Sequence, residues 1–170
     1  MEKVKIKEGF ADFIKVFPEV DLPVSLTEET RHLFSMQNKP ISDALVDAFI
    51  LPYEEGEAKE IDEFTEFMAC LKIPNTGSFH AFVFWRAGLL NYHYSIISFN
   101  QKGVFIDKRV IAGIYTDGDN ITQSIATIQP NMQILIASGQ TKDLSGQSFE
   151  AASATTYQLE IKLDGTIGNL

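Results

Sequence analysis

Carboxylates crowd one stretch of this chain, and their type and spacing suggest a definite chemistry. Residues 54–66, the acidic segment, carry seven acids and a single lysine, Lys59. Like charges at this density are costly to bury, so the pattern predicts a solvent-exposed loop or the exposed start of the next element. Its chemistry would be the attraction of a cationic partner, because clustered surface charge steers association. The candidate partner-binding residues are Glu54, Glu55, Glu57, Glu60, Asp62 and Glu63.

The charge of the whole chain is equally lopsided. The net charge of −9 lies in the first 70 residues, which hold 7 basic and 16 acidic side chains, whereas the rest of the chain holds 7 of each. This distribution favours a basic protein as partner and argues against nucleic acid, whose phosphates require clustered Lys and Arg. A surface that only keeps the chain in solution is the alternative interpretation, and the sequence leaves it open.

Residue types that bind metals or act as nucleophiles are present, but their spacing matches no known motif. His80 and His93 would face each other if paired residue numbers in their predicted hairpin summed to 173, yet a zinc site needs three or four ligands. The DGDN run at 117–120 is followed by apolar residues where a calcium loop needs further ligands, and it is typical of a tight turn. Cys70 lies in a strand pattern with no histidine near it in sequence, so we expect it to be buried.

We therefore predict no catalytic residue, no cofactor and no metal. A hydrolase is the third functional hypothesis, because two carboxylates that act as acid and base can be brought together by the fold alone.

A second binding hypothesis rests on the aromatic side chains of one predicted hairpin, residues 79–94. They are Phe82, Phe84, Trp85, Tyr92 and Tyr94. Such rings could line a pocket for a small ligand. The alternative interpretation is that successive rings face opposite sides of a central strand and pack in the core, with helices covering one side.

Helical patterns are confined to the first third of the chain. Pro18 ends the first of them, and Thr27 and Ser42 have the side chains that cap helix N-termini. Pro23 favours extended chain at 22–26. The predicted helices span 8–17, 28–34 and 43–50.

From residue 65 onward, apolar residues recur at every second position, which is typical of strands with one buried face. Short turns rich in Gly, Asn and Pro separate these runs, and such links favour antiparallel neighbours. The predicted strands span 65–73, 78–86, 90–99, 103–115, 120–128, 132–138 and 154–163.

Five runs succeed one another along the chain: FIKVFPEVDLPVSL, ISDALVDAFI, FHAFVFW, ISFNQKGVFID and YQLEIKLDG. In this order they resemble a diffuse group of small uncharacterised bacterial proteins, many of which carry a lipoprotein signal. The resemblance spans most of the chain and rests on hydrophobic and turn positions. It implies a bacterial origin and a C-terminal antiparallel β-meander, and it implies no activity or catalytic residue.

These patterns predict a single α+β domain over 1–170. We expect an antiparallel β-meander of about six to seven strands, with two or three short N-terminal helices packed on one face. Residues 1–64 would form an acidic part of helices and loops, and residues 65–170 the strands. No apolar run reaches the length of a signal peptide or a membrane span, so the chain as given is expected to be soluble and cytoplasmic. An exported and trimmed lipoprotein form is left open.

The leading functional prediction is a non-enzymatic protein-interaction module, of inhibitor or immunity type, whose acidic surface meets a basic protein. The alternative is a small-ligand-binding protein that uses the aromatic hairpin 79–94.

Overall fold

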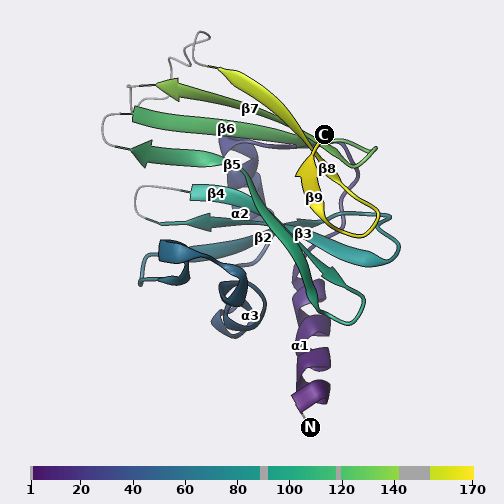
Figure 1. Ribbon diagram of the computed structural model, residues 1–170. Helices are drawn as coiled ribbons and strands as arrows, with labels where there is room; N and C mark the ends of the chain where they lie inside the picture. The colour runs from purple at the N-terminus through teal and green to yellow at the C-terminus, as the bar shows by residue number, and fades with distance from the viewer. Residues whose placement is uncertain (1, 89–91, 118–119, 142–153) are drawn as a thin grey trace.

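The computed structural model describes residues 2–88, 92–117, 120–141 and 154–170, and within them it has three α-helices and a nine-stranded antiparallel sheet (Figure 1). The helices are α1 (Glu2–Val16), α2 (Glu28–Gln37) and α3 (Asp43–Phe49), followed by the 3-10 helices η1 (Leu51–Tyr53) and η2 (Gly56–Lys59). Thr27 Oγ1 accepts a hydrogen bond from Thr30 N and Ser42 Oγ accepts one from Leu45 N, so both predicted caps are confirmed.

The strands are β1 (Val24–Leu26), β2 (Glu66–Lys72), β3 (Phe79–Ala87), β4 (Tyr92–Asn100), β5 (Phe105–Asp117), β6 (Asn120–Ile128), β7 (Gln133–Thr141), β8 (Thr155–Ile161) and β9 (Ile167–Asn169). The predicted count of six to seven is therefore too low. The strands β1 and β9 are each three residues long, which is too short for an apolar period to be recognised. Moreover, β1 places a strand inside residues 1–64, where helices and loops are predicted.

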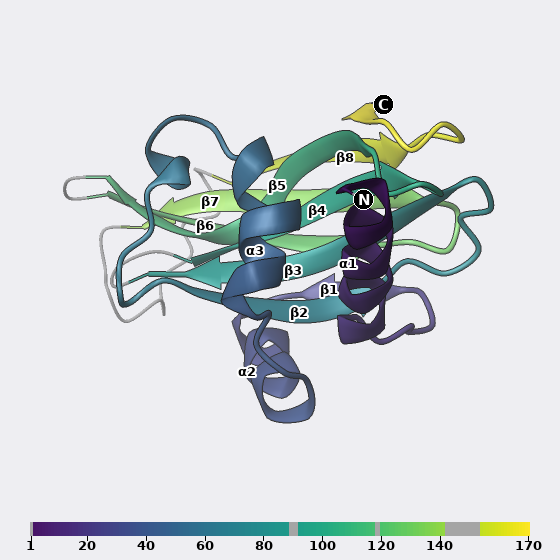
Figure 2. The ribbon, with the colours of Figure 1, turned by 90° about the horizontal axis from the view of Figure 1, so that it is seen from below.

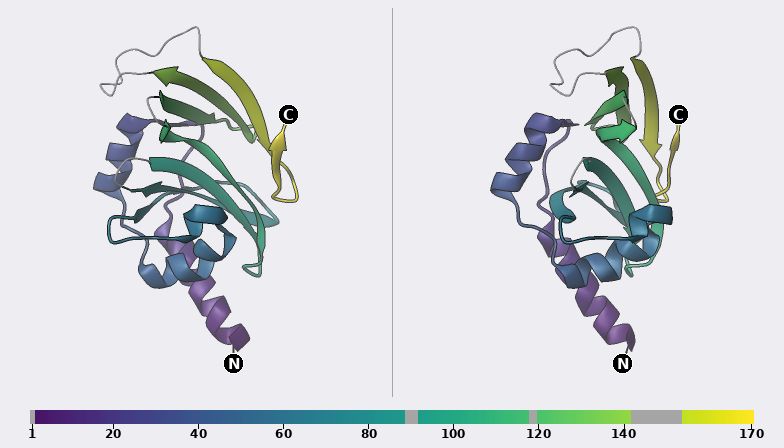
Figure 3. Two further views of the ribbon diagram at one scale, coloured as in Figure 1. Left: turned by 60° about the vertical axis from the view of Figure 1, so that its left-hand side comes forward. Right: turned by 90° about the vertical axis from the view of Figure 1, so that its left-hand side faces the viewer.

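The sheet follows the order β2 to β9, but it curls back on itself (Figure 3). Strand β5 pairs with β6 only from Gly113 onward, and the far end of β6 pairs instead with β1, with Val24 opposite Ile128. On the other side of the curl, Ile167 N of β9 donates to Asp107 Oδ2 of β5 at 2.8 Å. The curl gives the sheet an inner and an outer face.

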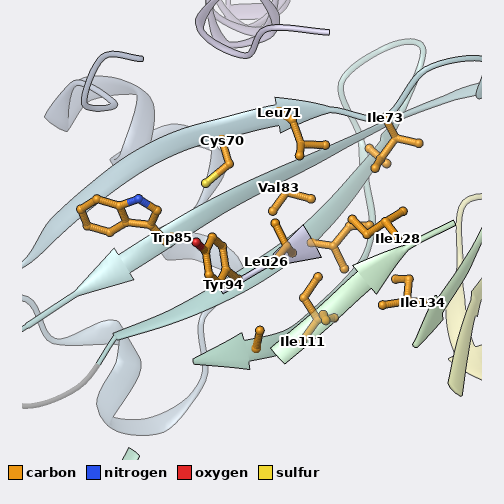
Figure 4. Packing of buried hydrophobic residues seen from close by; sticks show 14 of the residues in the cluster. Leu26, Cys70, Leu71, Ile73, Val83, Trp85, Tyr94, Ile111, Ile128 and Ile134 are labelled. Carbon is orange, nitrogen blue, oxygen red and sulfur yellow. The ribbon is translucent and has the colours of Figure 1, made fainter. Parts of the chain in front are cut away.

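The inner face is filled by apolar side chains from all nine strands. Figure 4 shows this inner core, which includes Leu26, Cys70, Val83, Trp85, Tyr94, Ile128 and Ile134. None of these side chains is more than 2% exposed, so the inside of the curl is packed solid. The expected burial of Cys70 is confirmed, and burial raises the pKa of its thiol.

Helices α1 and α3 cover the outer face, and we call this the helix-covered face (Figure 2). Its aromatic core consists of Phe10, Phe13, Phe17, Phe49, Phe67, Phe82, Phe84 and Phe99, together with smaller apolar residues. By contrast, Phe34 of α2 belongs to the inner core, with its ring centroid 6.4 Å from that of Tyr94. The predicted packing of two or three helices on one face therefore holds for α1 and α3 but not for α2. Because β1 enters the inner side to pair with β6, the helix that follows it starts on that side.

Strand β2 lies at one end of the strand order, and its unpaired edge is covered by other segments of the same chain. Asn38 Nδ2 donates to the carbonyl oxygens of Ala69 and Cys70, each at 2.9 Å. Ile41 N donates to Phe67 O, and Lys72 N donates to Pro18 O, both at 2.8 Å. A partner that adds a strand needs free edge groups, so this edge is a poor docking site.

Candidate functional site

The acidic segment begins with a buried carboxylate. Glu54 follows η1 directly and is 4% exposed. Its Oε1 lies 2.8 Å from Lys108 Nζ of β5, and its Oε2 lies 3.7 Å from Arg86 Nη1 of β3. Both cations are themselves nearly buried, at 11% and 12% exposed. The prediction of a solvated surface is therefore wrong for Glu54, because this carboxylate neutralises two cations that strand alternation places on the helix-covered face.

Arg86 also fixes the segment through the backbone. Its guanidinium donates to Ala58 O and, at 3.1 Å, to Glu60 O. The same group lies over the ring of Phe67, 5.3 Å from the ring centroid. A single arginine of β3 therefore holds both the Glu54 side chain and the main chain at residues 58–60. The acidic segment is anchored on the sheet.

Beyond Glu54, the segment presents its charges to solvent. The side chains of Glu55, Glu60, Asp62 and Glu63 are exposed, whereas that of Glu57, within η2, lies outside the described residues. Two large apolar side chains accompany them: Ile61 is 46% exposed and Phe64 52%. Asp62 Oδ1 accepts hydrogen bonds from Phe64 N and Thr65 Oγ1, which orders the turn between them. Five of the six candidate residues are thus placed, one buried and four at the surface.

A cleft of about 720 Å³ lies between the start of the acidic segment and strands β4 and β5. It is lined by Pro52, Tyr53, Glu54, Glu55, Ala58, Lys59, His93, Phe105, Asp107, Lys108, Arg109 and Val110. No motif in the sequence points to Arg86, Lys108 or Arg109. The one available signal was the pair of adjacent cations at 108–109 inside a predicted strand. One of two neighbouring strand residues faces the covered side of the sheet, where a charge requires a counter-charge.

His93 is the titratable group most affected by this environment. Burial lowers its pKa to about 4, and the cations Arg86 and Lys108 act in the same direction, while Glu54 opposes them. Its ring stacks on Tyr115 at a centroid distance of 5.8 Å. Its Nδ1 atom is buried and has no hydrogen-bond partner in the described part of the chain. At neutral pH, therefore, the cleft contains an uncharged imidazole.

The two histidines of the hairpin do not face each other. Paired residue numbers in β3 and β4 sum to 179, so His80 lies opposite Phe99 and His93 lies opposite Arg86. The register with sum 173 is wrong because β3 continues to Ala87 and β4 begins only at Tyr92, which makes the connection longer than a tight turn. The described residues contain no group of three His, Cys, Asp or Glu side chains that could hold a metal ion.

The aromatic rings of the hairpin 79–94 pack in the two cores. Phe82, Phe84 and Tyr94 are fully buried and Trp85 is 2% exposed. Tyr94 also donates from its hydroxyl to Thr27 O at 2.8 Å, which ties β4 to the start of α2. Of the hairpin's described residues, only His93 lines the cleft. The small-ligand alternative therefore finds no support in these rings.

Acid should weaken the fold partly through His93. The imidazole is neutral and buried in the folded chain, whereas in the unfolded chain it titrates near its ordinary pKa of 6.5. As the pH falls from 6.5 toward 4, the unfolded chain binds a proton at this imidazole and the folded chain does not, so the free energy of unfolding decreases. The stability that the neutral imidazole gives is therefore complete above pH 6.5 and lost below about pH 4. In His93→Gln, which does not titrate, the fall in the free energy of unfolding across this window should be smaller by on the order of 2 kcal/mol.

Urea denaturation at a series of pH values measures this slope. His32 is exposed, so His32→Gln is the matched control and should keep the slope of the parent chain. An unchanged slope in His93→Gln would contradict the assignment of this pH dependence to the cleft.

No described helix is both long and apolar enough to cross a membrane. The resemblance to small bacterial β-meander proteins stays a prediction. No protein-family model, no curated protein and no solved structure matches this chain.

Proposed function

We propose that the chain is a non-enzymatic protein-interaction module whose acidic segment docks a basic protein, as an inhibitor or immunity-type protein would. One observation carries the proposal. The segment is anchored at Glu54 and at residues 58–60, and between and beyond these anchors it exposes five described carboxylates, the last of them Glu66, and two large apolar side chains. A segment whose charges served only solubility would need neither the anchors nor the exposed Ile61 and Phe64.

Anchoring favours binding because the segment loses little conformational freedom when a partner docks. Phe64 and Ile61 supply apolar contact area, which is the usual source of affinity near the centre of an interface. The surrounding carboxylates supply long-range attraction, which acts mainly on the association rate. A basic partner surface with an apolar centre fits both features.

Neutralising the exposed acids should reduce partner capture and leave the fold intact. We expect Glu55→Gln, Glu60→Gln and Glu63→Gln together to change the free energy of unfolding by less than about 1 kcal/mol, since exposed ion pairs contribute little. The immobilised triple variant should retrieve less of the partner from a lysate of the organism of origin, and its capture should depend less on salt.

The matched control removes the same charge elsewhere. Asp12, Asp21 and Asp47 are exposed outside the segment, so their replacement by Asn should leave capture nearly unchanged. Phe64→Ala should reduce capture without altering net charge, which separates docking on the segment from a general charge effect. If the acidic triple variant retrieves the same proteins in the same amounts as the parent chain, the proposal is wrong.

A further inference from the structure

Strands β6 and β7 have the composition of strands that are covered on both faces. Residues 120–141, which contain both strands, include no Asp, Glu, Lys, Arg or His, although 22% of the chain is charged. A strand with one solvated face usually alternates apolar residues with polar or charged ones, whereas strands buried on both sides do without charge. This composition therefore predicts a cover on each face of the pair.

Only one face of the pair is covered within the chain. Ile128 and Ile134 are paired with each other, belong to the inner core and are fully buried. Ile125 and Leu135 lie at positions of opposite alternation, so they face the other way. They are 41% and 37% exposed, which is high for large apolar residues in the middle of a sheet.

The exposed side of β6 and β7 continues onto β1 and β8. Strand register places seven residues on it, and a hollow of about 350 Å³ lies there. Glu160, opposite Gln133 at the rim, is the one charged residue in the sequences of these four strands. We call this surface the uncharged face. Its residues are Ser25, Ile125, Thr127, Leu135, Ala137, Thr156 and Gln158.

The distribution of charge favours a second copy of the chain as the occupant of this face. The first 70 residues hold 16 acidic and 7 basic side chains, and Figure 1 shows α1 and α3 at the opposite end of the molecule from β6 and β7. Two copies repel each other through any surface that carries the acidic excess, and they can meet on the uncharged face with their acidic parts held apart. A strongly charged partner, by contrast, gains no attraction from a face without charges.

We propose that the protein forms a two-fold symmetric dimer through the uncharged face, with Ile125 and Leu135 of each copy packed against the other copy. A two-fold interface uses the same patch on both subunits, and sheets commonly pack face to face through such apolar side chains. The dimer goes beyond the docking of a basic protein and does not depend on it. The acidic segment is anchored on Arg86 of β3 and Lys108 of β5, so it stays available on both copies.

Sedimentation velocity of the full chain over a range of concentrations tests the dimer. We expect a shift from monomer to dimer with a dissociation constant of about 10 μM, as suits a small interface. Raising the salt concentration from about 0.05 to 0.5 M should tighten the dimer several-fold, because salt screens the repulsion between two acidic chains. Docking of a basic protein should weaken with salt, so the two proposals can fail separately.

Charged substitutions locate the interface. Leu135→Glu should weaken the dimer at least a hundredfold (~100), because the two-fold axis buries the new charge against an apolar face. Ile125→Lys should do the same with the opposite charge. Val104 is 58% exposed between β4 and β5 and lies outside the uncharged face, so Val104→Glu is the charge-matched control and should dimerise as the parent chain does. The urea midpoints, measured at a concentration where the parent chain is monomeric, should show that both interface variants fold.

A chain that stays monomeric at every concentration would overturn the proposal. So would a dimer that persists unchanged in folded Leu135→Glu or Ile125→Lys, or a dimer that salt weakens. If the chain is monomeric but Leu135→Glu alone loses a protein that the parent chain and Val104→Glu both capture, the uncharged face binds a different protein and the second copy is the wrong occupant.

Discussion

Glu54→Ala should destabilise the fold by about 3–5 kcal/mol, the cost of removing one partner from a buried ion pair. The substitution leaves Lys108 and Arg86 nearly buried without their common counter-charge, and it releases the start of the acidic segment. The free energy of unfolding, measured by urea denaturation near pH 7, checks this result. If the loss comes from the uncompensated charges, the double variant Glu54→Met with Lys108→Met should recover a large part of the lost free energy of unfolding, because apolar groups then replace the ion pair.

The neighbouring carboxylate provides the control. Glu55 is exposed, so Glu55→Ala should change stability by no more than about 0.5 kcal/mol. A loss below about 1 kcal/mol in Glu54→Ala would show that Lys108 and Arg86 can reach solvent on their own, and it would remove the anchor on which the docking proposal rests.

Phe82→Ala should cost about 3–5 kcal/mol, the range for a large side chain deleted from a packed core. Phe82 is fully buried on the helix-covered face. Its ring meets those of Phe13, Phe17 and Phe99 at centroid distances of 5.2, 4.7 and 6.2 Å. Phe13 belongs to α1, Phe17 follows the end of α1 directly, and Phe99 belongs to β4. The cavity would therefore open at the junction of helix and sheet, where rigid elements limit collapse.

Chemical denaturation measures this loss, and Phe64→Ala is the size-matched control. Phe64 is 52% exposed, so its truncation should cost less than about 1 kcal/mol. A similar small loss at Phe82 would mean that α1 does not pack on the sheet as described.

Local signals explain why the helices and the seven longer strands could be predicted from sequence. Thr27 and Ser42 are typical helix-capping residues, and each accepts a hydrogen bond from a backbone N–H three residues later, at the start of α2 or α3. The longer strands are indicated by apolar alternation. The predicted boundaries and the observed ones differ by only a few residues over most of these elements. The exception is α1, which begins well before residue 8.

What sequence could not supply depends on contacts between distant residues. The burial of Glu54 is set by Lys108, more than fifty positions away, and a run of acids gives no sign of which member will find a partner. Likewise, the side on which α2 packs follows from the pairing of β1 with β6. The cleft combines η1 and η2 with the first half of β5, so neither part alone identifies it.

The pairing of β1 with β6 also has a consequence for biosynthesis. Ser25 Oγ lies 3.3 Å from Thr127 Oγ1, across 102 positions of sequence. Strand β1 therefore has no partner until most of the chain has left the ribosome. In the same way, Phe10, Phe13 and Phe17 can be buried only after β3 and β4 have been synthesised. During that interval the nascent chain exposes apolar rings beside a large excess of acidic side chains. Mutual repulsion between neighbouring nascent copies then opposes their aggregation, at the stage when the fold cannot yet protect them.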